Sequence, residues 1–188
     1  MPPTDVRWLP EAELQRLCTD ADHCGWLIER GSLTQRLRTQ WGEVAVQVIT
    51  EGPAVPLPHE AQRLGLELTA TAWVRSVSLL CRGRPRLHAR TVIPAWSPHN
   101  PWAQVQHLGR QPLGELLFSL PDLQRSAFEW AADLPWPDAT PGQAPVGPGS
   151  LARRCVFVRA GAPLLLTELF PGFGERATAD APACRVSA

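Results

Sequence analysis

Two ionisable residues stand on apolar faces of predicted β-strands, where a charge is costly to bury. Residues 71–81 have the alternation of a strand, and Arg75 falls on its bulkier face. The side chains that share this face are Trp73, Val77, Leu79 and Cys81. Residues 163–170 form a second such strand, on which Glu168 shares a face with leucine and phenylalanine side chains only. An isolated buried ion is destabilising, so each group must be paired or must line a polar cavity.

The pattern allows two interpretations of this arginine and glutamate. In the first, Arg75 and Glu168 form a structural salt bridge, or the strand ends that carry them reach water. In the second, a cavity lies between the sheet and the helices. Arg75 then binds an anionic ligand there, and Glu168 transfers a proton.

Arg90 is a secondary candidate on the strand predicted at residues 86–93. It shares a polar face with His88 and Arg86. Such a face is typical of a strand side that is open to solvent. The alternative is that Arg90 lines a route into the pocket.

The sequence contains none of the familiar motifs for metal or nucleotide binding. Its five histidines have neither HxH nor HExxH spacing, and there is no GxGxxG, GxxxxGK[ST] or GxSxG segment. All 18 basic residues are arginine, so no lysine is present to form a Schiff base with pyridoxal phosphate. The sequence therefore gives no support for a metal site or a nucleotide-phosphate loop, and it excludes lysine-bound pyridoxal phosphate.

Composition and charge exclude several classes of protein. The chain has 188 residues, 44% of them hydrophobic and 19% charged, which is typical of a globular protein. Eighteen basic and eighteen acidic residues cancel, so nothing in the overall charge favours nucleic acid. No apolar run approaches the roughly 18 residues of a membrane span. The N-terminus lacks the features of an export signal. We predict a cytoplasmic monomer.

The five cysteines include no CxxC pair and are predicted to be reduced thiols.

The elements that must position these residues are short helices followed by β-hairpins. Helices are predicted at residues 11–18, 23–30 and 33–41, with Ser32 as the N-cap of the third, and again at 113–118 after Pro112. Strands are predicted at residues 44–50, 69–81, 86–93, 123–134, 151–159 and 163–170. This order predicts an α+β fold with an antiparallel sheet and helices over one face. We expect one domain over residues 1–188, with an ordered core at about 8–171 and a poorly ordered tail at 172–188.

Four segments together resemble the chorismate lyase family. They are WLIERGSLT at 26–34, WVR at 73–75 with ARTVIP at 89–94, LG at 108–109 with PLG at 112–114 and LF at 117–118, and PLLLTELF at 163–170. Each segment is modest alone, but their order and spacing match the family from about residue 8 to residue 171.

The resemblance implies a fold, a reaction and a set of site residues. The fold is a six-stranded antiparallel sheet with helices on one side and an internal ligand cavity under two helix-turn-helix flaps. The reaction converts chorismate to 4-hydroxybenzoate and pyruvate at the start of ubiquinone synthesis. Substrate-binding residues fall on Leu33, Arg75, Leu113 and Glu168, of which Arg75 and Glu168 are catalytic. Leu33 stands where the best-known family member has methionine, a nearly isosteric change.

One alternative function belongs to a different class. The same fold occurs as the UTRA ligand-sensing domain of bacterial transcription regulators, which binds small molecules without catalysis, and fold alone does not decide function. The neutral charge and the lack of a basic recognition helix in the sequence argue against a DNA-binding regulator.

Overall fold

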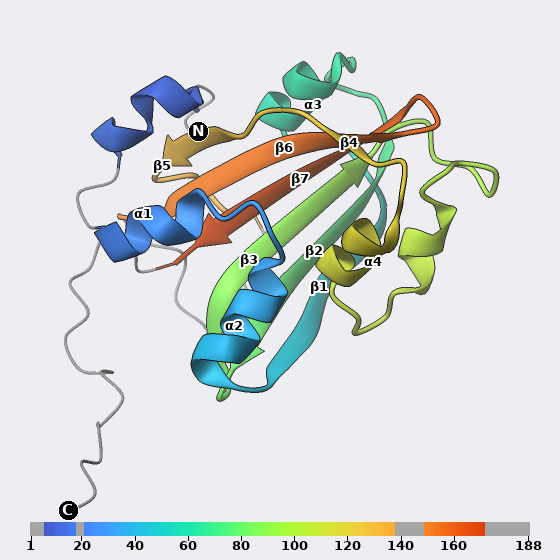
Figure 1. Ribbon diagram of the computed structural model, residues 1–188. Helices are drawn as coiled ribbons and strands as arrows, with labels where there is room; N and C mark the ends of the chain where they lie inside the picture. The colour runs from blue at the N-terminus through green and yellow to red at the C-terminus, as the bar shows by residue number, and fades with distance from the viewer. Residues whose placement is uncertain (1–5, 18–20, 138–148, 172–188) are drawn as a thin grey trace, which may run out of the picture.

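A single antiparallel sheet organises the chain (Figure 1). The computed structural model describes residues 6–17, 21–137 and 149–171. The strands follow the order β1-β2-β3-β7-β6-β4, and β5 also pairs with β6. They are β1 Val44–Ala54, β2 Ala72–Cys81, β3 Arg84–Ile93, β4 Gln124–Arg125, β5 Glu129–Ala132, β6 Leu151–Arg159 and β7 Ala162–Phe170. Every pairing is antiparallel, which confirms the predicted α+β class and adds a seventh strand to the six expected.

Short helices lie against this sheet. They are the 3₁₀ helices η1 Glu11–Arg16 and η2 Ala103–His107, and the α-helices α1 Ala21–Leu27, α2 Leu33–Trp41, α3 Pro58–Leu64 and α4 Leu113–Ser119. Helix α2 begins as predicted, because the Ser32 side chain accepts a hydrogen bond from the Gln35 N–H at 3.2 Å. In Figure 1, α1, α2 and α4 lie in front of the sheet and α3 lies beyond its upper edge.

Two tight hairpins fix which residues meet in the sheet. The turn Arg82–Gly83 joins β2 to β3, and Ala160–Gly161 joins β6 to β7, all four with positive φ. Positive φ at both central residues is the type I′ pattern, whose twist matches that of the strands and which glycine adopts without strain. Both hairpins were predicted. Pairing of β3 with β7 then joins them into one sheet.

The larger core lies between the sheet and the helices in front of it. Trp26 and Leu37 from α1 and α2 and Leu117 from α4 belong to one buried cluster with strand residues such as Leu79 and Leu166. Burying each such side chain contributes about 1.5–3 kcal/mol. The apolar sides of the N-terminal helices therefore pack on this face of the sheet.

The opposite face is also covered, which corrects the prediction of helices on one side only. Leu64 of α3 packs against a second buried cluster that includes Val74, Val92 and Leu165. His88 is 5% exposed and Arg90 is 6% exposed, so the solvated-face interpretation is wrong for both. The sequence signal failed because no helix had been predicted between residues 50 and 69, a segment interrupted by prolines at 53, 56 and 58.

Proline placement explains two further differences from the prediction. Strand β1 continues through Pro53, because an edge strand needs no outward N–H donor at that position. Pro58 stands in the first turn of α3, where its missing N–H costs nothing, and the Glu60 carboxylate accepts a hydrogen bond from the Leu57 N–H at 2.8 Å.

The single strand expected over residues 123–134 is instead divided into β4 and β5.

The cysteine prediction holds only in part. Cys81 and Cys155 are free and buried, whereas Cys24 is disulfide-bonded. The missing CxxC pair did not exclude this, because any two cysteines with Cα atoms within about 7 Å can be bridged. Cys18, Cys184 and the predicted tail lie outside the described residues. Within the residues described, no helix is long and apolar enough to cross a membrane.

Two histidines behind the sheet predict how stability depends on pH. Burial lowers the pKa of His88 and His59 from 6.5 to about 4, and for His59 the nearby Arg154 and Arg90 lower it further. In the unfolded chain both side chains take up protons near pH 6.5. We therefore expect the free energy of unfolding to fall as pH drops from 6.5 to 4, by up to about 3 kcal/mol per histidine.

Urea unfolding followed by tryptophan fluorescence at several pH values measures this effect. His88 lies 2.7 Å from the Ser78 hydroxyl, and His88→Asn keeps a polar partner there without the titrating ring. The variant should lose part of the pH dependence between 6.5 and 4. If the free energy of unfolding of the variant depends on pH as that of the wild type does, His88 does not cause the acid sensitivity.

Candidate active site

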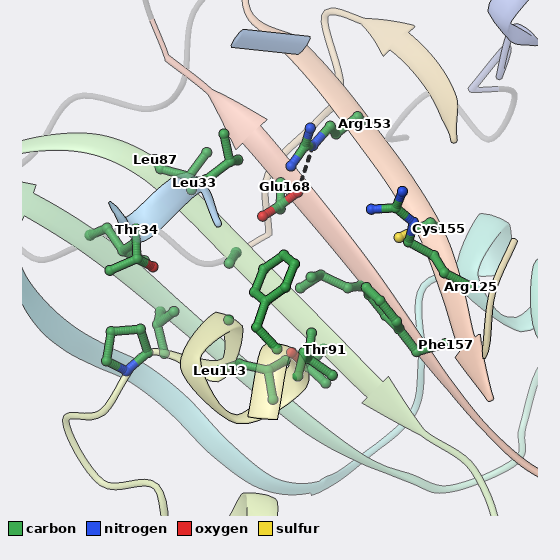
Figure 2. A pocket seen from close by; sticks show the side chains of 18 of the residues that line it. Leu33, Thr34, Leu87, Thr91, Leu113, Arg125, Arg153, Cys155, Phe157 and Glu168 are labelled. Atoms are coloured by element: carbon green, nitrogen blue, oxygen red, sulfur yellow. Dashed lines mark hydrogen bonds and ion pairs between the residues drawn. The ribbon is translucent and has the colours of Figure 1, made fainter. Parts of the chain in front are cut away.

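A pocket lies between the front face of the sheet and the first turns of α2 and α4 (Figure 2). Its volume is about 60 Å³, several times the roughly 10–15 Å³ that one water needs. The strand residues that line it alternate along β2, β3, β7 and β6: Arg75, Val77, Leu79, Leu87, Ala89, Thr91, Leu166, Glu168, Arg153, Cys155 and Phe157. The remaining walls include Leu33, Thr34, Pro112, Leu113, Gly114, Leu117, Phe118, Arg125 and Phe128. The surface is therefore mostly apolar, with a few charged groups.

Arg75 is buried at the β1 side of the pocket and is 2% exposed. Its Nη2 donates to the Gly109 carbonyl at 2.7 Å. Its Nη1 lies 2.9 Å from Oε1 of Glu51, the residue opposite on β1, yet it has no hydrogen-bond partner. The carboxylate balances the charge of the guanidinium, and at least one N–H remains free to meet another acceptor. Such a group suits the binding of a carboxylate ligand.

Glu168 is paired with Arg153 from the neighbouring strand. The two residues face each other in the β6–β7 register, and Arg153 Nε donates to Glu168 Oε2 at 2.6 Å (Figure 2). Arg153 also donates to the carbonyls of Leu27 and Glu29, and its guanidinium lies 4.4 Å from the Phe128 ring centroid. The proposed Arg75–Glu168 salt bridge is therefore wrong, since each group has a different partner on an adjacent strand.

The sheet register sets the spacing between the two predicted catalytic residues. Arg75 lies opposite Thr91, which lies opposite Leu166, two residues before Glu168 on β7. Strand spacing and rise place the Cα atoms of Arg75 and Glu168 about 12 Å apart. Both side chains line the same pocket. The two charged side chains therefore belong to one pocket, on strands that are separated by β3.

Leu33 and Leu113 each stand first in a helix at the pocket wall. The N–H of the first helical residue has no acceptor within its own helix, so it can donate to a ligand. The two helices also contact each other at their exposed sides, where Arg38 Nη1 lies 2.5 Å from Glu115 Oε1. An ion pair this exposed contributes little to stability.

Arg90 does not line the pocket and lies on the opposite face of the sheet. Its Nε donates to Glu60 Oε1 at 2.9 Å, and its Nη1 donates to the Ser76 hydroxyl at 3.3 Å. Successive strand residues face opposite ways, and Ala89 and Thr91 are the ones that line the pocket. The expectation that Arg90 lines an entry route is corrected accordingly.

Sequence reasoning missed Arg153, Cys155 and Arg125. Alternation along residues 151–159 places Arg153, Cys155 and Phe157 on one face, so the signal for the first two was present. Arg125 lies in a two-residue strand, where no periodicity can be read.

The pocket groups favour acid–base chemistry over nucleophilic attack by the Cys155 thiol. Burial, with a contribution from the charge of Glu168, raises the pKa of the Cys155 thiol to about 12. The thiol is thus a poor nucleophile near neutral pH. Among the described residues, no group of three or more His, Cys, Asp or Glu side chains is arranged to hold a metal ion. What the arrangement offers is anion binding beside a carboxyl group that can exchange a proton.

Comparison with known proteins identifies close relatives. A family model described as "Chorismate lyase" matches residues 2–173. The chain is 38% identical over 170 residues to a protein from Hydrogenovibrio crunogenus named "Probable chorismate pyruvate-lyase", covering 88% of this chain and 90% of the relative. Proteins with the same name from Thiobacillus denitrificans and Bordetella pertussis are 41% and 34% identical, covering 78% and 92% of this chain and 80% and 92% of each relative.

Solved structures share the fold at lower sequence identity. PhnF from Mycobacterium smegmatis superposes with a TM-score of 0.52 and 18% identity, covering 83% of this chain and 70% of PhnF. Its effector domain alone gives a TM-score of 0.51 and 17% identity, covering 77% of this chain and 91% of the domain. At this identity the likeness concerns the fold only.

The buried Arg90–Glu60 pair predicts a purely structural effect of mutation. Arg90→Met leaves the Glu60 carboxylate buried without its guanidinium partner. We expect the free energy of unfolding in urea to fall by about 3–5 kcal/mol. Adding Glu60→Gln removes the buried charge and should restore part of the loss. A single variant within about 1 kcal/mol of wild type would contradict this role.

Proposed function

The chain belongs to the chorismate lyase family, and from this premise we propose that it converts chorismate to 4-hydroxybenzoate and pyruvate. Relatives that carry this activity in their names are 34–41% identical over most of the chain. The observation that carries the proposal is the pocket itself, in which a buried arginine and a carboxyl group line an otherwise mostly apolar wall. This is the chemistry that an aromatic acid requires.

Arg75 would hold the ring carboxylate of the substrate. Its guanidinium is buried, and its charge-assisted hydrogen bonds each contribute about 1.5–3 kcal/mol. Leucine, valine and phenylalanine side chains around the ring would exclude water and fix its orientation.

Glu168 would contact the ring hydroxyl and assist proton transfer. The ether bond between the ring and the enolpyruvyl group breaks, and the carbon that bears the hydroxyl loses its hydrogen. The ring becomes aromatic, and the proton is delivered to the methylene carbon of enolpyruvate to give pyruvate. Aromatisation supplies the driving force, so the reaction needs neither a metal nor an organic cofactor.

Leu33 and Leu113 would belong to two flaps that close the pocket into an internal cavity. The first flap comprises α1 and α2, and the second comprises η2 and α4. The N–H groups at the first positions of α2 and α4 would donate to the bound ligand. Opening of these flaps would release the product and limit turnover.

The wider biological setting follows from the same proposal. The reaction would supply the first aromatic intermediate of ubiquinone synthesis. We propose a cytoplasmic, monomeric, single-domain enzyme without a nucleic-acid partner. The alternative considered from the sequence, a UTRA-like ligand sensor without catalysis, predicts binding of a small molecule without release of pyruvate.

Pyruvate release from chorismate tests the function and the roles of two residues. Wild-type protein should produce pyruvate, whereas Glu168→Gln should lower kcat by about 10²–10⁴-fold, since it removes the proton-transfer group. Arg75→Met should raise the dissociation constant of 4-hydroxybenzoate at least about tenfold, because it removes a charged hydrogen bond. Glu129→Gln is the matched control, since Glu129 is also paired with arginines but lies outside the pocket.

Two results would contradict these assignments. Pyruvate release at the wild-type rate by Glu168→Gln would remove Glu168 from the chemistry. Binding of 4-hydroxybenzoate without any pyruvate release by the wild-type protein would favour the ligand sensor.

Arg153 is expected to act as a positioning residue for Glu168 and for the segment before α2. Arg153→Gln should lower kcat about tenfold or more while changing the KM for chorismate less, because the carboxyl group loses its fixed orientation. It should also speed amide hydrogen exchange in residues 27–32, since the carbonyls of Leu27 and Glu29 lose their donor.

Arg154→Gln provides the control for this experiment. Arg154 is the next residue along β6, but it is paired with Glu129 outside the pocket. It should leave exchange in residues 27–32 unchanged. If both variants change this segment equally, Arg153 has no special role there.

A further inference from the structure

Arg125 differs from the other two arginines of the pocket. Arg75 is paired with Glu51, and Arg153 is paired with Glu168. Arg125 forms no ion pair with any residue that the structure describes. Its side chain donates from Nη1 to the Arg30 carbonyl at 3.1 Å, and its guanidinium lies 4.6 Å from the Phe128 ring centroid. It is therefore held in place by neutral groups only.

The charges around the pocket leave one positive charge unbalanced. Three guanidinium groups, those of Arg75, Arg125 and Arg153, face two carboxylates, those of Glu51 and Glu168. The unbalanced charge belongs to Arg125. Chorismate carries two carboxylates, whereas 4-hydroxybenzoate carries one. These five side chains carry a net charge of +1, and Arg75 and Arg125 together offer one guanidinium group to each carboxylate of the substrate.

Arg125 and Arg75 line the pocket from strands at different ends of the sheet, β4 and β2, with Glu168 of β7 between them in the strand order. In the proposed pose the ring carboxylate would bind Arg75 and the ring hydroxyl would meet Glu168, and the enolpyruvyl ether would occupy the neighbouring ring carbon. Figure 2 shows the Arg125 guanidinium reaching toward Cys155, on the β6 side of Glu168. The two arginines therefore lie on different sides of the pocket and can address different carboxylates of one ligand.

We propose that Arg125 binds the enolpyruvyl carboxylate, the group that the substrate has and the aromatic product lacks. This inference rests on the proposed function and names a residue for recognition of its substrate. Because Arg125 is exposed at the rim, it also attracts the dianion before the flaps close.

Paired ligand titrations test this role without requiring turnover. The two probes are 4-hydroxybenzoate, with one carboxylate, and 3-(carboxymethoxy)-4-hydroxybenzoate, whose second carboxylate occupies the enolpyruvyl position. Arg125→Gln keeps a donor for the Arg30 carbonyl but removes the charge. It should weaken the dicarboxylate about tenfold or more, and change affinity for 4-hydroxybenzoate by less than about threefold. The kcat/KM for chorismate should fall with the affinity for the dicarboxylate.

Two controls separate charge at this position from other effects. Arg16→Gln removes an exposed arginine of η1, outside the pocket, and should change neither affinity. Raising the salt concentration should weaken binding of the dicarboxylate to the wild-type protein more than to Arg125→Gln, since an exposed charge is screened.

The outcomes distinguish failure of this inference from failure of the proposed function. Equal weakening of both ligands by Arg125→Gln, or no weakening of either, would overturn the role of Arg125. Selective weakening of the dicarboxylate by Arg125→Gln, together with no pyruvate release from chorismate by the wild-type protein, would overturn the function and leave the carboxylate site standing.

Discussion

The ion pair between Arg153 and Glu168 on adjacent strands is the interaction on which the pocket depends. A carboxylate at that depth needs a counter-charge, and the β6–β7 register supplies one directly opposite. The same guanidinium donates to two carbonyls of the segment that leads into α2. The group at the centre of the proposed chemistry and the segment that would close over it are therefore held by one side chain.

Both faces of this sheet are buried, and each has its own set of paired charges. Strand β6 shows the principle most clearly, because the consecutive residues Arg153 and Arg154 serve opposite faces. Arg153 pairs with Glu168 in the pocket, and Arg154 pairs with Glu129 on the far side. Strand β3 also directs consecutive residues to opposite faces. Ala89 lines the pocket, and Arg90 pairs with Glu60 behind the sheet. Separating the networks in this way keeps charges needed for stability away from those available to a ligand.

Alternation in the sequence was enough to find Arg75 and Glu168, because it depends only on neighbouring residues. Their partners were not predictable in this way, since Glu51 and Arg153 are brought opposite them by the register between strands. The back of the sheet was misjudged for a related reason. The alternation of His88 and Arg90 is typical of a face that is open to solvent. Helix α3 covers this face, but the prolines around α3 obscured the helical pattern in the sequence. Arg125 lies in too short a strand to produce a pattern at all.

The outer edge of β1 has a consequence for the behaviour of the chain at high concentration. An open edge strand of this length offers a template for sheet growth between molecules. Here Pro53 lacks a donor, and the ladder shifts its register between Val48 and Thr50. A foreign strand aligning along this edge would lose continuous hydrogen bonding within a few residues. The irregularities of β1 therefore disfavour aggregation by strand pairing between molecules.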